Sequence, residues 1–204
     1  MLDPRLFDGV ASVLVGIWGH GGEMLYIALL RGINVGGHTV KMERLRALLT
    51  DLGLANVRTY IQSGNVFFES DRTDSDALAQ EIATHLAAQL GYAVPTMLRS
   101  VEEVEQHLAR NPFAQIGSTP DNRFCIVFTD TPIPADLALP AVSPKGDMEI
   151  VGMDGRDAFV VWHLIGGRPP ASSAETWLAR TLGGRTTTRF FHTTAKILEA
   201  AKKG

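Results

Sequence analysis

The sequence predicts an α+β protein built from two tandem ferredoxin-like halves, each a split βαβ unit, with mostly antiparallel sheets. Short β-rich runs alternate with segments whose leucines recur at helical spacing. The order strand, helix, strand, strand, helix, strand is complete within residues 24–100, and a looser version follows residue 121. The length of 204 residues suits one large domain or two small ones that pack closely.

The first half is expected to span residues 24–116. Thr39 is placed to cap a leucine-rich helix that Gly53 ends. The pair Ser63-Gly64 separates two β-rich runs, which predicts a hairpin with a two-residue turn. The expected elements are strands over 25–32, 57–62, 65–69 and 94–99, and helices over 39–52, 74–90 and 100–111, the last opened by a capping box of Ser100 and Glu103.

The second half is expected to span residues 117–204. Ser172 with Glu175 forms another capping box, and Gly183 ends the helix that follows. Because no close sequence identity links the halves, their relationship is inferred from element order alone. The expected elements are strands over 123–129, 148–151, 158–164 and 186–190, an irregular crossover over 131–140, and helices over 172–182 and 193–202.

Residues 1–23 are expected to be an extension upstream of the true start at Met24, frayed or loosely docked. The apolar run over 9–18 is shorter than the roughly 20 residues that span a bilayer, so no membrane partner is expected. A secretory signal would need a more basic start and a small-residue cleavage site, and neither is clear here. A cleaved signal is therefore the second interpretation.

Composition and charge are typical of a globular protein. The chain is 45% apolar and 20% charged, with a formal net charge of −3. This charge argues against general binding to duplex nucleic acid, which requires many Lys and Arg side chains on phosphates. The single cysteine, Cys125, lies in an apolar run and cannot form an internal disulfide, so we expect a packing role and a cytoplasmic location.

Neither a metal site nor a cofactor is expected. The six histidines show no H-x-H or H-E-x-x-H spacing, and the chain has no cysteine pair. His85 and His107 fall in helical stretches and are expected to be surface or packing residues. His192, at the junction of the last strand and helix, has a functional interpretation because Arg189 lies three residues before it.

The loop that follows the first strand is the clearest ligand-site candidate. An apolar strand leads into Arg31 and a loop with Asn34 and three glycines, and Lys41 follows where a helix begins. Glycines allow positive φ and turn backbone N–H groups outward, and a helix N-terminus favours anions. The loop is neither G-x-G-x-x-G nor a Walker sequence, and a tight turn explains its glycines almost as well. The basic residues at both ends of the loop favour an anion.

The predicted hairpin would present a polar and aromatic face. Alternation places on it Arg58, Tyr60, Gln62, Asn65, Phe67 and Glu69. In a functional interpretation, this face stacks a base or small ring. In a structural interpretation, the second half packs over it and leaves the polar groups at the rim.

Three stretches of the sequence are distinctive: Leu29–Gly37 with Lys41-Met42, Val57–Val66, and Asn111–Phe113. They closely resemble the signature of the domain-of-unknown-function family DUF1697, and the resemblance runs from Met24 to near the C-terminus. It implies a bacterial-type cytosolic α+β protein with two ferredoxin-like halves. It implies no activity.

The second half departs from the pattern of this family, which has a Gly-Arg-Ser-Lys-type turn and an Arg-Asn-Trp-Asn-Thr-type stretch. In this chain, the segment that corresponds to the turn is Gly166–Pro170, and the segment that corresponds to the second stretch is Arg189–Thr193. Both segments keep an arginine, Arg168 in the first and Arg189 in the second, whereas the amide and indole groups are replaced.

These residues favour the binding of a small anionic or nucleotide-like ligand by the Arg31–Lys41 loop and the 58–69 hairpin. The expected ligand-binding residues are Arg31, Asn34, Lys41, Tyr60, Gln62, Asn65, Arg168 and Arg189. One alternative is an enzyme acting on a phosphorylated or carboxylated metabolite, with His192 or Tyr60 handling protons. Another is a single-stranded nucleic-acid-binding module on the hairpin face. No acid–base pair is recognisable, so the sequence assigns no catalytic residues.

Overall fold

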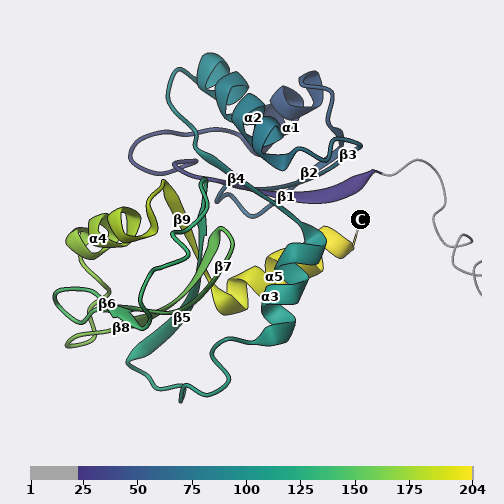
Figure 1. Cartoon of the computed structure of the whole chain (residues 1–204). Helices are drawn as coiled ribbons and strands as arrows, with labels where there is room; N and C mark the ends of the chain where they lie inside the picture. Colours follow the sequence, from purple (N-terminus) through teal and green to yellow (C-terminus); the bar gives the residue numbers. More distant parts are fainter. Residues whose placement is uncertain (1–22, 204) are drawn as a thin grey trace, which may run out of the picture.

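The computed structural model describes residues 23–203 as a mixed α/β structure with two antiparallel sheets and five helices (Figure 1). The extension expected over residues 1–23 lies, apart from Glu23, outside the described residues. The first strand begins at Met24. No described helix combines the length and apolar character that crossing a lipid bilayer requires.

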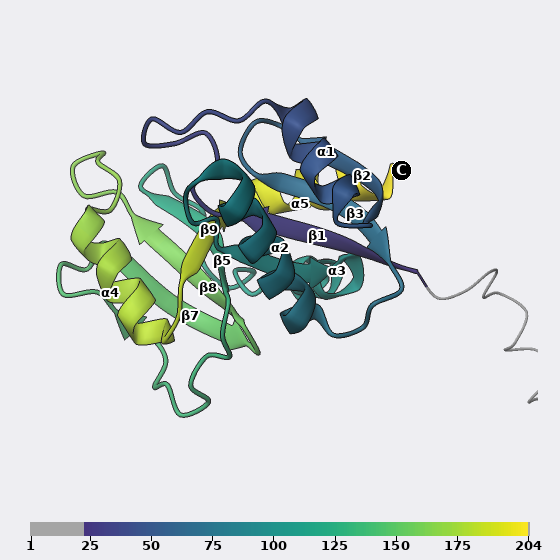
Figure 2. The same cartoon turned by 90° about the horizontal axis from the view of Figure 1, so that it is seen from above.

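Four strands and three helices make up the first half. They are β1 (Met24–Leu30), α1 (Met42–Asp51), β2 (Ala55–Tyr60), β3 (Asn65–Ser70), α2 (Ser75–Leu90), β4 (Thr96–Ser100) and α3 (Val101–Arg110). The antiparallel sheet has the order β2-β3-β1-β4, and α1 and α2 lie across one of its faces (Figure 2). Because side chains alternate along β1, Tyr26 and Ala28 pack against these helices, whereas Ile27 and Leu29 face the other side.

The second sheet repeats this strand order and adds one short edge strand. The elements are β5 (Asn122–Thr129), β6 (Ala141–Val142), β7 (Met148–Asp154), β8 (Asp157–His163), α4 (Ser172–Leu182), β9 (Thr186–Phe190) and α5 (Phe191–Lys202). The order is β6-β7-β8-β5-β9, so β7-β8-β5-β9 corresponds to β2-β3-β1-β4. α4 covers one face together with Ile133 of the crossover segment, which takes the place of a first helix.

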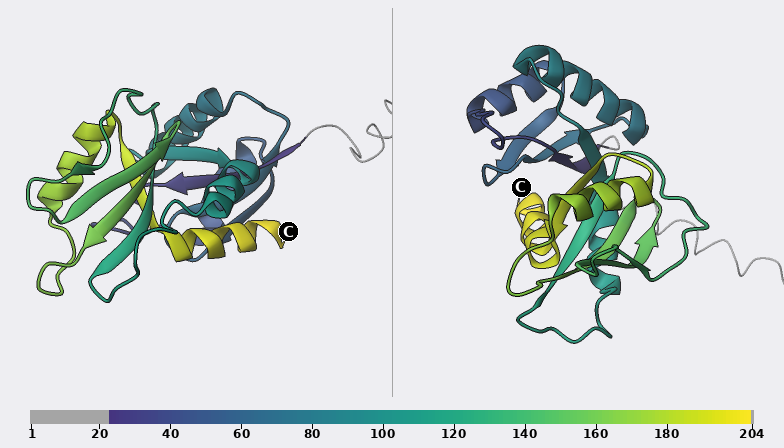
Figure 3. Two further views of the ribbon diagram at one scale, coloured as in Figure 1. Left: turned by 60° about the horizontal axis from the view of Figure 1, so that its bottom comes forward. Right: turned by 90° about the vertical axis from the view of Figure 1, so that its left-hand side faces the viewer.

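The faces of the two sheets that these helices leave open pack against each other. Ile27 and Phe67 of the first sheet share one buried cluster with Ile126 and Phe128 of the second. α3 and α5, which follow the last strand of each half, lie side by side at this junction (Figure 3). The hairpin face is therefore covered by the second half, as in the structural interpretation of its polar and aromatic residues.

Each half sends one arginine from its last strand into the other half. Arg99 of β4 lies opposite Ile27 of β1, and Arg189 of β9 lies opposite Ile126 of β5. Both isoleucines stand three residues before the end of the strand that contains them. The two arginines therefore occupy equivalent positions in the two sheets.

The partners of these arginines are equivalent as well. Arg99 donates to the carboxylate of Asp157, the first residue of β8, with Nη2–Oδ1 at 2.7 Å. Arg189 donates from Nε to the amide oxygen of Asn65, the first residue of β3, at 2.9 Å. The pairs differ in charge, because one has a carboxylate where the other has a carboxamide.

Arg99 and Asp157 form a buried ion pair, with exposed fractions of 1% and 2%. His107 of α3 completes it, with Nε2 2.7 Å from the Asp157 carboxylate. Burial alone would raise the pKa of Asp157, but the hydrogen bond from His107 and the Arg99 charge hold this pKa below its usual range. His107, expected to be a surface or packing residue, thus belongs to a polar network between the halves.

Three local predictions were wrong. The hairpin connection is the four-residue segment 61–64 rather than a two-residue turn, because Tyr60 pairs with Asn65. α1 has Lys41 rather than Thr39 at its N-cap, and α4 begins after Ala171 rather than with a capping box. In α4, the carboxylate of Asp147 accepts from the Ala171 amide at 3.3 Å, so a distant residue replaces the expected cap.

Gly64, at the end of the hairpin connection, is expected to tolerate no side chain. It has φ +73, and a Cβ there would lie 2.8 Å from the carbonyl oxygen of Leu30. Gly53 has φ +86 with nothing within 4 Å of an added Cβ, so it is a matched control for backbone strain alone. We expect Gly64→Ala to lower the free energy of unfolding by about 2 kcal/mol more than Gly53→Ala, measured by urea denaturation. Equal losses would show that the close approach of Leu30 is easily relieved.

Candidate functional site

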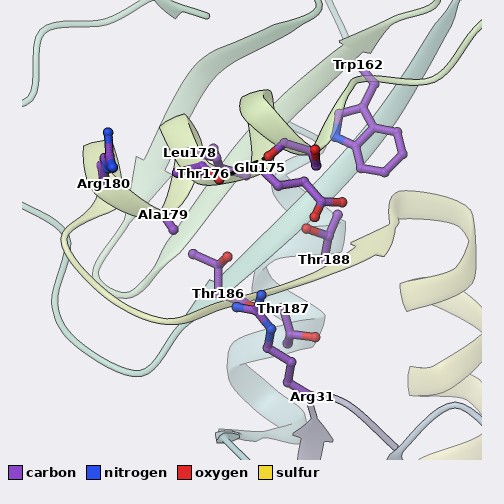
Figure 4. Close-up of a pocket in the computed structure, with 11 residues that line it drawn as sticks. Arg31, Trp162, Glu175, Thr176, Leu178, Ala179, Arg180, Thr186, Thr187 and Thr188 are labelled. Atoms are coloured by element: carbon purple, nitrogen blue, oxygen red, sulfur yellow. Dashed lines mark hydrogen bonds between the residues drawn. The ribbon is translucent and has the colours of Figure 1, made fainter. Parts of the chain in front are cut away.

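A hollow of about 690 Å³ lies between α4, the edge strand β9 and the end of β1 (Figure 4). Hydroxyl groups, charged groups and an indole line it, contributed by Arg31, Trp162, Ser172, Glu175, Thr176, Leu178, Ala179, Arg180, Thr186, Thr187 and Thr188. Pockets that bind small molecules have volumes of about 300–1,000 Å³. The first half contributes Arg31, and the second half contributes the other lining residues.

β9 presents both hydroxyls and backbone amides at this hollow. The amide of Asp130 donates to the carbonyl of Arg185 at 3.2 Å, which fixes the hydrogen-bond alternation between β5 and β9. The amides and carbonyls of Thr186 and Thr188 consequently point away from β5, toward the open edge. Thr188 also lies opposite Val127, whose side chain packs on the α4 side, so the hydroxyls of both threonines face α4.

Arg31 places a guanidinium at the edge of β9. Its backbone amide donates to the carbonyl of Pro95 at 2.9 Å, which continues the pairing of β1 and β4. Its side chain is exposed and donates from Nη1 to the Thr186 carbonyl at 2.9 Å. Within the described part of the chain, no carboxylate lies within ion-pairing distance of this guanidinium. Arg31 thus has donors to spare at the mouth of the hollow.

Glu175 and Trp162 define the opposite side. The Glu175 carboxylate points into the hollow in Figure 4, across from Arg31. The Trp162 ring packs edge-on against Phe190 at 5.4 Å between centroids. Its indole nitrogen is buried and has no hydrogen-bond partner among residues 23–203. The half-buried ring of Trp162, rather than its covered N–H, is what this residue presents to the hollow.

The two asparagines of the predicted site are occupied by the protein itself. Asn34 donates from Nδ2 to the carbonyl of Gln62 at 3.1 Å and accepts from the Val40 amide at 2.7 Å, tying the loop to the hairpin connection. Asn65 donates from Nδ2 to the hydroxyl of Ser63 at 2.9 Å while accepting from Arg189. Their amides therefore hold the fold together rather than point into a hollow.

Arg189 is likewise satisfied by protein atoms. Its Nη2 donates to the carbonyl of Ser63 at 3.1 Å, and its Nη1 to the carbonyl of Thr188 at 3.0 Å and the hydroxyl of Thr187 at 2.9 Å. Burial lowers the pKa of Arg189 to about 10. The guanidinium stays charged at neutral pH and lies between the halves, outside the lining of the hollow.

The other predicted residues do not line the hollow either. Tyr60 packs against the core between the halves, and the hydrogen bond that reaches Gln62 is to its backbone. Lys41 is exposed at the start of α1, and Arg168 is exposed in the turn after β8. His192 is exposed on α5 and stacks on Phe190. The structure therefore brings Arg31 into the hollow and leaves the rest of the predicted set outside its lining.

Sequence reasoning missed the second-half side of the hollow. The run Thr186-Thr187-Thr188 carried a signal, because alternating threonines on an edge strand place hydroxyls on one face. Glu175 was assigned to a cap, and Trp162 to a strand. Among the described residues, no group of three or more His, Cys, Asp or Glu side chains is arranged to hold a metal ion.

A smaller hollow of about 180 Å³ occupies the corresponding place in the first half, between α2 and β4. The residue directly after β5 is Asp130, where the residue directly after β1 is Arg31. Asp130 accepts from the amide of Arg185 at 2.8 Å and pairs with its guanidinium. Asp76 and Arg156 form another ion pair in the same hollow. In this second hollow, the protein's own carboxylates and guanidinium groups pair with one another.

The fold and the hollow thus define a two-sheet α/β protein with a polar small-molecule-sized hollow. The chain belongs to the family described as "Protein of unknown function (DUF1697)", which matches residues 24–159. The match includes Arg31 but ends before α4 and β9, short of the resemblance to near the C-terminus that the sequence predicts.

The conserved bacterial protein SP0830 from Streptococcus pneumoniae has a similar structure, with a TM-score of 0.60 and 24% sequence identity. The alignment covers 89% of this chain and 99% of that protein, so the likeness extends over both halves and concerns the fold. A comparison with curated proteins found no match.

Proposed function

We propose that the protein binds a small anionic metabolite in the hollow between α4 and β9, and that Arg31 holds the anionic group. The observation that carries this proposal is a guanidinium that has no carboxylate partner among residues 23–203 and lies beside strand amides and threonine hydroxyls at one edge. Guanidinium and N–H groups together are the donors that carboxylates and phosphates prefer. This proposal retains the hypothesis from the sequence that Arg31 binds an anion. It places the rest of the ligand against α4 and β9 instead of the hairpin.

The smaller hollow between α2 and β4 supports this proposal as an internal comparison. There, the carboxylate of Asp130 is matched by Arg185, and that of Asp76 by Arg156. In the open hollow, Arg31 has no such partner among the described residues. An external anion would supply at Arg31 the negative charge that Asp130 and Asp76 supply in the smaller hollow.

Arg189 strengthens the attraction for an anion without contacting it. Its equivalent, Arg99, is neutralised by Asp157, whereas Arg189 has the uncharged amide of Asn65. Its partners at this end of β9 are carbonyl, hydroxyl and amide oxygens. A buried charge that has no counterion among residues 23–203 raises the potential at the nearby hollow.

Replacing Arg31 tests the proposal. We expect inorganic phosphate, ribose 5-phosphate or citrate to raise the melting temperature of the wild-type protein. We expect Arg31→Ala to weaken this binding at least about tenfold, which corresponds to about 1.4 kcal/mol, by isothermal titration calorimetry.

Arg44→Ala is the matched control. Arg44 is an exposed arginine on α1, outside the lining of the hollow, and it also donates to a backbone carbonyl, that of Gln89 at 3.1 Å. This variant should bind as the wild type does. Equal binding by the Arg31 variant, or no binding by the wild type, would contradict the proposal.

We also infer that each half is a variant of the ferredoxin-like unit and that the protein works in the cytoplasm. The shared strand order of the two sheets supports the first inference, with the second half lacking one helix. The lone cysteine, Cys125, supports the second, because a chain that cannot form an internal disulfide is typical of reducing compartments.

A further inference from the structure

Glu175 restricts where negative charge can lie in the hollow. Its carboxylate points in from α4 and has no ion-pair partner within residues 23–203. An ionised carboxylate accepts hydrogen bonds and repels other anions. The anionic group of a ligand is therefore directed to Arg31, and the part of the ligand near Glu175 must carry hydrogen-bond donors. A ribose diol is such a group, and acidic side chains bind it in dinucleotide sites.

Trp162 provides an aromatic surface at the same hollow. Its ring is half-buried, and its buried indole N–H has no acceptor among the described residues. A heterocyclic base combines a flat π-face with nitrogen and oxygen acceptors on its edge. The flat face of such a ring can pack on the indole ring, whereas an aliphatic ligand offers no π-face.

The volume of the hollow and the charges that line it further restrict the class of ligand that it can bind. A volume of about 690 Å³ exceeds what a bare phosphate or carboxylate fills. Two arginines line the hollow, Arg31 at the threonine edge and Arg180 on α4, together with the carboxylate of Glu175. A triphosphate would bring more negative charge than these side chains balance. A single phosphate group matches this balance better.

We infer that the ligand is a ribonucleoside 5′-monophosphate, an inference that rests on the proposed anion site. The phosphate lies at Arg31 and the outward amides of Thr186 and Thr188, the ribose hydroxyls on Glu175, and the base against Trp162. The 2′-hydroxyl is then a determinant of specificity.

The test compares each of the four common ribonucleoside monophosphates with its 2′-deoxy counterpart by isothermal titration calorimetry, with ribose 5-phosphate as a further probe. In the wild type, at least one ribonucleotide should bind about tenfold more tightly than its deoxy form, because a hydrogen bond to a charged group is lost. In Glu175→Ala, this ratio should fall to about two or less, since the acceptor is gone.

Glu102→Ala is the control, because Glu102 lies in the first turn of α3 as Glu175 lies in the first turn of α4. It should keep the wild-type ratio. Equal binding of ribo and deoxy forms, or ribose 5-phosphate binding as tightly as every nucleotide, would overturn the nucleotide inference while Arg31-dependent binding upheld the anion site. Nucleotide binding unchanged in Arg31→Ala would instead overturn the anion site itself.

Discussion

Asp157→Asn is expected to lower the free energy of unfolding by about 3–5 kcal/mol, because it leaves the buried guanidinium of Arg99 without a counterion. Arg99 makes hydrogen bonds from both Nε and Nη2 to this carboxylate, and His107 contacts its other side. Asparagine keeps the shape of the side chain, so the loss reports on charge. Urea denaturation of both proteins measures it.

Glu81→Gln is the matched acid-to-amide control, because Glu81 pairs with Arg72 at the surface. We expect this variant to lose about 0–1 kcal/mol. A loss in Asp157→Asn no larger than in the control would mean that the buried pair adds nothing to the junction of the halves.

The same variant should change how stability depends on pH. The pKa of Asp157 is lower in the folded protein than in the unfolded chain, so its stabilising contribution is present above the unfolded value, about 4. As the pH falls through the folded-state pKa, this contribution is lost. Asp157→Asn should therefore lose less stability than the wild type between pH 5 and the acid limit of folding, about pH 2. Parallel curves would contradict this.

Arg189→Met is expected to cost about 3 kcal/mol, because carbonyl and amide oxygens at the junction lose their donor while most of the side-chain volume is kept. The affected groups include the Ser63 carbonyl and the Asn65 amide oxygen, at 3.1 and 2.9 Å. A double-mutant cycle with Asn65→Ala should give a coupling energy of about 1–2 kcal/mol.

Arg44→Met is the control for this series and should stay within about 0.5 kcal/mol of the wild type, as surface substitutions do. Arg44 makes its single hydrogen bond at the surface. If the effects of the Arg189 and Asn65 substitutions are additive, the hydrogen bond between these two side chains does not couple the halves.

Much of the fold is predictable because each element carries local signals. The Ser100 capping box opens α3 as expected, and Gly91 and Gly183 end α2 and α4 with positive φ. The length of the hairpin connection was predicted wrongly because Ile61 has φ 49. β-branched residues rarely adopt a positive φ, so the sequence gives no reason to expect it here. Here, long-range contacts override local preference.

The site was harder to predict because it forms between segments far apart in the sequence. Arg31 was identified from its position at a strand end, which is a local feature. Glu175, Trp162 and the β9 threonines meet it only when the second sheet packs against the first. Asn34 and Asn65 carry amides that could bind a ligand, but these amides make hydrogen bonds to neighbouring loop residues instead. No local sequence pattern distinguishes an asparagine whose amide makes hydrogen bonds within the fold from one whose amide binds a ligand.

The exchange of Arg99 and Arg189 between the halves has the geometry of a twofold homodimer enclosed in a single polypeptide. In such a dimer, the same residue of each subunit contacts the same partner in the other, and a mutation changes both copies at once. Because this chain encodes the two copies separately, each can diverge alone. The Arg99 contact has Asp157 and lies at the smaller, ion-paired hollow, whereas the Arg189 contact has Asn65 and lies near the larger one. Covalent fusion thus allows an asymmetry that identical subunits cannot encode.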